Sequence, residues 1–179
     1  AAITSLGTQW DKQVEKGRMS ADDAAACKSR LRGAMVLGEL AACDLVVEAI
    51  VERIDVKQAL FAEVEAIVSP TTVLVTNTSS LSVTAIAAKL KRPQLFAGYH
   101  FFNPVPLMKV VEVISGLKTD PAVCDRLYAY AGQMGHKAVR AQDTPGFIVN
   151  HAGRGFGTEA LRIVSEGVTD FVTIDRILK

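Results

Sequence analysis

Asp44-Leu-Val-Val-Glu-Ala-Ile50 is a nearly continuous apolar run that contains β-branched residues. A run of this kind is typical of a strand that is buried on both faces of a parallel sheet. The spacing of apolar residues then predicts a helix over residues 56–68 and further strands at 72–76 and 95–99. Because buried strands alternate with helices, the sequence predicts an α/β fold.

The remaining elements are predicted from the same spacing and from the signals at their ends. Ser20 with Asp23 three residues later resembles a capping box, and Asp120-Pro121 supplies an N-cap followed by proline in the first turn. The expected elements are helices over 1–17, 21–32, 82–90, 121–134, 147–166 and 169–179, an edge strand at 34–37, and strands at 109–114 and 136–141. In this interpretation residues 1–142 form the α/β domain and residues 143–179 begin a second, all-helical domain.

The composition excludes several classes of protein. Of the 179 residues 49% are hydrophobic and 22% are charged, with a net charge of +1, which argues against a nucleic-acid partner and against disorder. No apolar run reaches the roughly 18 residues of a membrane span, and no secretory signal begins the chain. Cys27, Cys43 and Cys124 are too scattered for a disulfide framework or a zinc site. We therefore expect a cytoplasmic protein without a metal or a membrane partner.

Three polar loops follow predicted strands directly. They are Glu48-Ala-Ile-Val-Glu52, Asn77-Thr-Ser-Ser80 and Tyr99-His-Phe-Phe-Asn-Pro104. In an open parallel sheet, ligands bind beyond the carboxyl ends of the strands. Because all three loops are expected at that edge, together they indicate a binding site more strongly than any one of them does.

His100 and Glu112 are the candidate catalytic pair. The chain reverses between them, so the imidazole and the carboxylate can meet, and a carboxylate beside one ring nitrogen leaves the other free to take a proton. Phe101, Phe102 and Pro104 would then keep water away from the pair. On spacing alone, a structural histidine and a solvated glutamate is the favoured alternative.

The other candidate residues also have ordinary interpretations. Ser79 and Asn77 could bind a substrate, or they could cap the helix that begins near residue 82. Asn150, in the first turn of a helix, could donate to a carbonyl oxygen or form only local hydrogen bonds. Glu52 and Lys57 could touch a cofactor, or they could be a solvated helix start with the lysine on an exposed face. The run Gly153-Arg-Gly-Phe-Gly157 lies inside a helical pattern and departs from G-x-G-x-x-G, so it predicts close helix packing and no phosphate loop.

Taken together, the motifs resemble the 3-hydroxyacyl-CoA dehydrogenase family. The segment over residues 151–162 is similar to that of longer bacterial members of the family, which are associated with short-chain or 3-hydroxyadipyl-CoA substrates. The resemblance extends over nearly the whole chain in the order of the family, and its most specific part is the His-Phe-Phe-Asn-Pro block with its downstream glutamate. The matching segments are residues 44–52, Thr76-Asn-Thr-Ser-Ser-Leu81, Gly98-Tyr-His-Phe-Phe-Asn-Pro-Val-Pro106, Met108-Lys-Val-Val-Glu-Val113 and Asp143-Thr-Pro-Gly-Phe-Ile-Val-Asn150.

The resemblance implies a Rossmann-like, doubly wound domain and NAD-dependent oxidation of a 3-hydroxyacyl-CoA to the 3-ketoacyl-CoA in acyl-CoA catabolism. It implies that His100 is the general base, that Glu112 orients it, and that Ser79 and Asn150 bind oxygen atoms of the substrate. The same resemblance implies a homodimer formed by the helical domain. The residues implied to line the NAD cleft are Ala49, Ile50, Glu52, Lys57, Asn77 and Asn103.

Two departures from the family keep other interpretations open. The strand and G-x-G-x-x-G turn that seat the pyrophosphate of NAD, and the acidic residue for its ribose, are absent, so we expect a sheet without its first strands. We also expect the helical domain to be incomplete at residue 179. The alternatives are a non-catalytic relative such as a lens lambda-crystallin, or an inactive part of the enzyme that serves as a binding module. A dehydrogenase of free β-hydroxyacids is disfavoured, since such relatives use a lysine base.

Overall fold

The computed structural model describes residues 2–178, and the chain divides into two compact units, one ending at Leu40 and the other beginning at Ala41. The first unit contains α1 (Ala2–Glu15), α2 (Ala21–Arg30) and the short 3₁₀ helix η1 (Leu37–Leu40). The predicted cap of α2 is confirmed, because Ser20 Oγ accepts a hydrogen bond of 3.0 Å from the Asp23 amide.

The edge strand predicted at residues 34–37 is wrong. The Glu39 carboxylate accepts hydrogen bonds from the amides of Met35 (2.7 Å) and Val36 (3.2 Å). These bonds form the turn that precedes η1. The amides of Met35 and Val36 therefore cannot donate to a neighbouring strand.

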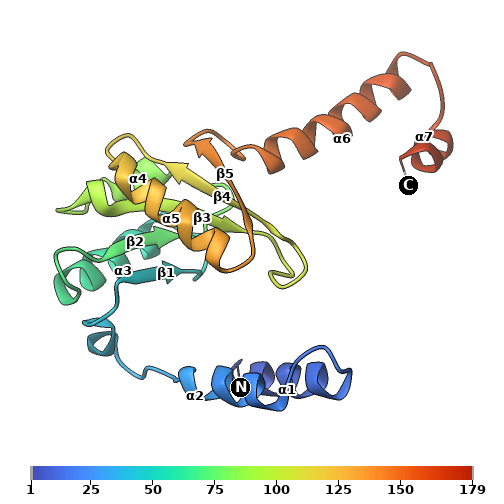
Figure 1. Ribbon diagram of the computed structural model, residues 1–179. Helices are drawn as coiled ribbons and strands as arrows, with labels where there is room; N and C mark the ends of the chain where they lie inside the picture. The colour runs from blue at the N-terminus through green and yellow to red at the C-terminus, as the bar shows by residue number, and fades with distance from the viewer. Residues whose placement is uncertain (1, 179) are drawn as a thin grey trace. The chain divides into compact units, whose positions relative to one another are not determined.

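The second unit contains a five-stranded sheet in the order β1-β2-β3-β4-β5 (Figure 1). Strands β1, β2 and β3 are parallel, β4 runs antiparallel to β3, and β5 is parallel to β4. The strands are β1 (Leu45–Glu48), β2 (Val73–Thr76), β3 (Phe96–Phe101), β4 (Val110–Ser115) and β5 (Lys137–Gln142). The helices are α3 (Ile54–Ile67), α4 (Val83–Ala87), η2 (Pro93–Leu95), α5 (Pro121–Gln133), α6 (Val149–Ser165) and α7 (Phe171–Ile177).

Helices cover both faces of this sheet, as a doubly wound arrangement requires. On one face α5 packs on alternate residues of the strands, and the Tyr99 hydroxyl donates to the Leu127 carbonyl at 3.0 Å. On the other face lie α3, whose Phe61 ring meets Phe96 edge-on at 4.7 Å, and α4 (Figure 1). Successive residues of a strand point to opposite faces, so Phe96 and His100 share the face of α3 and α4, while Tyr99 faces α5.

A glycine lets α4 approach the sheet closely. A Cβ added at Gly98 would lie 2.8 Å from Ile114 Cβ and 2.9 Å from Val83 Cγ2. Any larger residue would therefore push α4 and the loop before it away from the strands.

The helix signals near the end of the chain are confirmed. Asp120 caps α5 by accepting from the Ala122 amide at 2.9 Å, and α6 ends before Gly167, which has a φ of 70°. The close packing expected at Gly153, Gly155 and Gly157 is not present within the described residues, because a Cβ at each would meet open space. No helix within residues 2–178 is both long enough and apolar enough to cross a membrane.

Candidate functional site

His100 and Glu112 face each other across two strands. They are paired in the antiparallel register of β3 and β4, which places their side chains on the same face of the sheet. His100 Nδ1 lies 2.7 Å from Glu112 Oε2, and the two residues are only 3% and 0% exposed. The sequence-based expectation that the reversal of the chain brings the two groups together is met.

The second oxygen of Glu112 holds the start of α6. Glu112 Oε1 accepts hydrogen bonds from the amides of Ile148 and Val149, both at 2.9 Å. Gly146 and Phe147 turn the chain into this position with φ values of 79° and 49°. A helix N-terminus carries partial positive charge, so this arrangement stabilises a fully buried carboxylate.

Aromatic rings cover the imidazole on the side of the loop after β3. The ring centroid of Phe102 lies 4.5 Å from that of His100, and the centroid of Phe147 lies at 5.7 Å. The expectation that Phe101 shields the pair is wrong, because strand alternation turns Phe101 to the opposite face, where it packs on Tyr99. Pro104 is also wrongly predicted as a shield, since it is exposed.

Ser79 connects the loops around His100. Its Oγ lies 3.1 Å from His100 Nε2, its amide donates to Glu52 Oε1 at 3.0 Å, and its carbonyl accepts from Asn150 Nδ2 at 3.4 Å. Ser82, and neither Ser79 nor Asn77, is the N-cap of α4, where its Oγ accepts from the Ala85 amide. The capping interpretation of Ser79 and Asn77 is therefore wrong.

Lys57 is buried, with a side chain that is 1% exposed, so its placement on an exposed helix face is wrong. Its Nζ lies 2.6 Å from Glu48 Oε1 and 3.3 Å from Glu52 Oε2. Burial of Glu52 raises its pKa, but hydrogen bonds from Thr78 and Ser79 and the ammonium of Lys57 outweigh burial, and the pKa is lowered below its usual range. Glu52 is therefore held as a carboxylate.

The other candidate residues lie on the same loops. Asn77 Oδ1 accepts from the Phe101 amide at 2.8 Å, which links the ends of β2 and β3. Ala49 and Ile50 are exposed just after β1, and Asn103 is exposed two residues after β3. The side chains of Ala49, Ile50 and Asn103 are open to solvent, in contrast to the buried His100–Glu112 pair.

The sequence placed Glu48 and Thr78 in polar loops at this edge but indicated no role for either residue, and it indicated none for Phe147. Glu48 and Thr78 are buried and hydrogen-bonded to the residues described above. A signal for Glu48 was available: an acidic residue within a buried apolar run needs a compensating partner. Phe147 gave no comparable signal, since its contact with His100 depends on the turn at Gly146.

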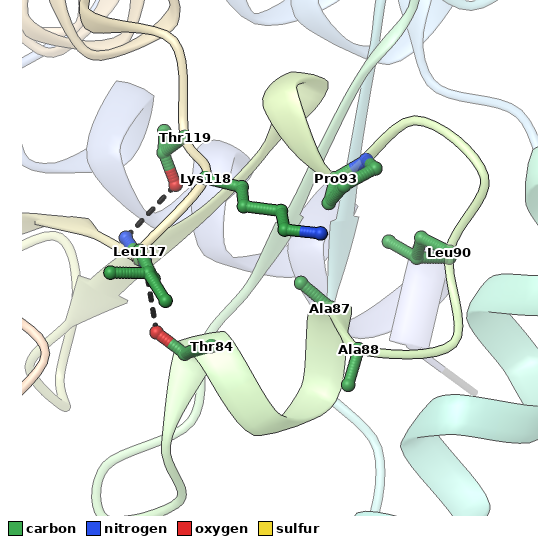
Figure 2. A pocket seen from close by; sticks show the side chains of 9 residues that line it. Thr84, Ala87, Ala88, Leu90, Pro93, Leu117, Lys118 and Thr119 are labelled. Carbon is green, nitrogen blue, oxygen red and sulfur yellow. Dashed lines mark hydrogen bonds between the residues drawn. The ribbon is translucent and has the colours of Figure 1, made fainter.

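A cavity of about 190 Å³ lies at the opposite edge of the sheet (Figure 2). One of its lining residues, Thr119, donates to the carbonyl of Phe96, the first residue of β3, whereas His100 lies near the end of that strand. Among the described residues that line the cavity, Lys118 is the only titratable one, and Figure 2 shows its side chain extending toward Pro93. The cavity therefore lacks paired acid and base groups of the kind found around His100.

Comparison with protein families gives one match over most of the chain. The model described as "3-hydroxyacyl-CoA dehydrogenase, NAD binding domain" matches residues 1–144. The chain is 43% identical over 178 residues to 3-hydroxyadipyl-CoA dehydrogenase of Escherichia coli K12, covering 99% of this chain and 38% of that protein. It is 44% identical over 167 residues to the fatty acid oxidation complex subunit alpha of Pseudomonas syringae, covering 93% of this chain and 23% of the relative.

Solved structures show the same fold. The crystal structure of 3-hydroxybutyryl-CoA dehydrogenase from Escherichia coli K12 matches with a TM-score of 0.90 and 44% identity, over 94% of this chain and 36% of that one. The (S)-3-hydroxybutyryl-CoA dehydrogenase of Ralstonia eutropha matches with a TM-score of 0.90 and 32% identity, over 96% and 60% of the two chains. This chain thus corresponds to part of each of these proteins.

Proposed function

The chain belongs to the 3-hydroxyacyl-CoA dehydrogenase family, and we propose that it carries the catalytic base of an NAD-dependent dehydrogenase that converts a 3-hydroxyacyl-CoA to the 3-ketoacyl-CoA. The observation that carries this proposal is the buried His100–Glu112 pair, with Ser79 at the second nitrogen of the imidazole. A structural histidine needs no ring nitrogen that faces an exposed hydroxyl at the end of a strand where ligands bind, whereas a general base needs one that a substrate can reach.

The hydrogen bonds around His100 define how it would move a proton. Glu112 accepts a hydrogen bond from the Nδ1–H of His100, which leaves the lone pair on Nε2 directed toward Ser79 Oγ. When a substrate hydroxyl replaces or joins the Ser79 hydroxyl there, Nε2 accepts its proton and the ring becomes an imidazolium. The Glu112 carboxylate, fixed by two amides at the start of α6, stabilises that positive charge.

Ser79 and Asn150 would orient the substrate. The Ser79 hydroxyl is exposed beside Nε2, and the Asn150 amide approaches from α6, so both can donate to an oxygen at C3 or at the neighbouring thioester. Phe102 and Phe147 would limit water at the imidazole, which strengthens the electrostatic effect of Glu112.

The residues at the end of β1 fit the nucleotide of NAD. Ala49 and Ile50 are exposed apolar surface, and the Glu52 side chain, which is 40% exposed, presents carboxylate oxygens that can accept from ribose hydroxyls. Asn77 and Asn103, on the next two loops, would line the nicotinamide side of the cleft. NAD, when bound there, supplies the acceptor for the hydride that leaves C3.

Further features of the whole protein stay predictions. The match over residues 1–144 supports a boundary near residue 142, after which the helical domain would form a homodimer interface. The names of the relatives support a substrate of the 3-hydroxyacyl-CoA class and a place in fatty acid oxidation. A cytoplasmic location is expected from the sequence alone.

Replacement of His100 by glutamine tests the proposal. We expect His100→Gln, in the full-length protein, to lower kcat for 3-hydroxybutyryl-CoA oxidation by about 10²–10⁴-fold, the usual contribution of a general base. NAD affinity, measured by fluorescence titration, should stay close to that of the wild type, because His100 bonds to Ser79 and Glu112 and to no proposed NAD contact.

A second histidine provides the matched control. His151 is exposed on α6, and its ring nitrogen contacts only the carbonyl of Pro145 among the described residues. His151→Gln should keep wild-type kcat. Equal turnover by His100→Gln and the wild type would contradict the proposed function.

A further inference from the structure

Glu48 and Lys57 form a buried ion pair beside the proposed NAD cleft. Both side chains are 1% exposed, and Glu48 Oε1 accepts from Lys57 Nζ and from the Ile50 amide, each at 2.6 Å. Glu48 Oε2 accepts from Thr76 Oγ1 at 2.7 Å. Burying two charges costs more than an apolar pair of the same size would, even when the charges are hydrogen-bonded. A role other than stability would explain such a pair.

Two routes of hydrogen bonds lead from Glu48 to the loop of residues 77–80. In the first, Thr76 Oγ1, which donates to Glu48, accepts from the Thr78 amide at 3.2 Å. In the second, Lys57 lies against Oε2 of Glu52, while Oε1 of Glu52 accepts from the Thr78 hydroxyl and from the Ser79 amide. The Glu48 carboxylate therefore anchors this loop both through Thr76 and through Lys57.

The loop ends at the catalytic base. Ser79, fixed through its amide by Glu52, places its hydroxyl 3.1 Å from His100 Nε2. We propose that Glu48 is a positioning residue that, through Lys57 and Glu52, sets the Ser79 hydroxyl against His100. This inference rests on the proposed function of His100. It assigns Glu48 no contact with substrate or cofactor.

The physical consequence of removing the Glu48 charge follows from the geometry. Without it, Lys57 is a buried ammonium with Glu52 as its remaining carboxylate, at 3.3 Å. The attraction would draw Glu52 toward Lys57 and away from the amide of Ser79. A shift of about 1 Å in a group that orients the reaction costs up to about 10²-fold in rate.

The test compares two buried carboxylates: Glu48 at the end of β1, which is paired with Lys57 of α3, and Glu65 near the end of α3. Glu65, 7% exposed, accepts from the amides of Lys91 and Arg92 at the far edge of the sheet. In the full-length protein we expect Glu48→Gln to lower kcat by about 10–100-fold. Glu65→Gln should lower the melting temperature but leave kcat unchanged. Equal losses of kcat in both variants, or wild-type kcat in Glu48→Gln, would overturn the proposal.

A spectroscopic readout separates positioning from general damage. The ¹⁵N resonance of His100 Nε2 should shift in Ser79→Ala, which removes its hydroxyl partner, and should shift in the same direction in Glu48→Gln. It should stay in place in Glu65→Gln. An unshifted resonance in Glu48→Gln would overturn the proposal even if kcat falls.

A double variant covers the case in which Glu48→Gln does not fold. Glu48→Gln combined with Lys57→Met leaves no unpaired buried charge, so its melting temperature should exceed that of Glu48→Gln. Its kcat should stay low, because Glu52 has lost Lys57. Wild-type kcat in the double variant would overturn the proposal.

The outcomes also separate this proposal from the proposed function of His100. If His100→Gln is inactive while both Glu48 variants are fully active, only the positioning role fails. If His100→Gln is itself fully active, the proposed function fails with it.

Discussion

At the carboxyl ends of β1, β2 and β3, titratable side chains bond to one another as well as to the backbone: Glu48 bonds to Lys57, and His100 to Glu112. At the opposite edge, side chains bond mainly to the backbone. Thr72 donates to the Cys43 carbonyl, and Thr119 donates to the Phe96 carbonyl. Backbone contacts of this kind satisfy polar groups where the chain turns. Contacts between side chains set charges and donors that a ligand can share, so only the first edge is organised for chemistry.

Among the changes that test this comparison of the two edges, the exchange of Glu112 for glutamine should have the largest effect. Glu112→Gln removes the negative charge beside the imidazole but keeps the size of the side chain. We expect kcat for 3-hydroxyacyl-CoA oxidation to fall by at least about 10²-fold, because the imidazolium loses its counter-charge and the tautomer is no longer fixed. Steady-state kinetics would measure this, with circular dichroism as the control for folding. A wild-type kcat would remove Glu112 from the mechanism.

Asp143 follows β5 and accepts hydrogen bonds from the start of α4, and its loss should have an intermediate effect. Burial raises the pKa of Asp143, but hydrogen bonds from Thr84, Ser82 and Val83 outweigh burial and lower its pKa below the usual range. Asp143→Asn should reduce the free energy of unfolding by about 0.5–2 kcal/mol at neutral pH, as loss of a helix cap does. Urea denaturation would measure the difference.

The lowered pKa of Asp143 also gives this effect a pH dependence. A depressed folded-state pKa contributes stability that is fully present above the unfolded value of about 3.9 and is lost as the pH falls through the folded value. The difference between wild type and Asp143→Asn should therefore be constant from neutral pH down to about pH 5 and shrink below about pH 4. A difference that grows toward acid would contradict the assignment of these hydrogen bonds to the ionised carboxylate.

Thr119→Val should have the smallest effect and should sharpen the contrast between the edges. The variant loses the bond from Thr119 Oγ1 to the Phe96 carbonyl and the bond that Oγ1 accepts from the Gly116 amide. We expect a stability loss of about 1 kcal/mol for these contacts and an unchanged kcat. Thermal unfolding and steady-state kinetics on the same samples would check both. A large loss of activity would show that the opposite edge takes part in function.

Local sequence signals predicted most of the helices and strands. The apolar runs near residues 45, 73 and 96 became β1, β2 and β3. Strands β2 and β3 are buried, but the burial on both faces predicted for β1 is wrong, because β1 lies at the end of the strand order and Val47 is exposed. The cap residues Asp120 and Ser20 placed the starts of α5 and α2 correctly. The run at 34–37 failed because a single carboxylate, Glu39, satisfied the amides that a strand would have used.

The site was predicted only where its geometry is local. His100 and Glu112 are joined by one reversal of the chain, so their meeting follows from the antiparallel pairing that the sequence indicates. Glu48 and Lys57 lie on different elements, and Phe147 reaches His100 across a turn. No spacing rule relates such residues, because their contact depends on how helices and loops settle on the sheet.

The sequence by itself determined the α/β class, the family, and some of the residues that meet at one edge of the sheet, His100 and Glu112 among them. Tertiary structure alone decided which of them are buried and which charges compensate one another. The physical reason is that periodicity and motifs are properties of neighbours along the chain. Burial of Lys57 between Glu48 and Glu52, and the seating of Glu112 at the start of α6, depend instead on groups brought together from distant segments.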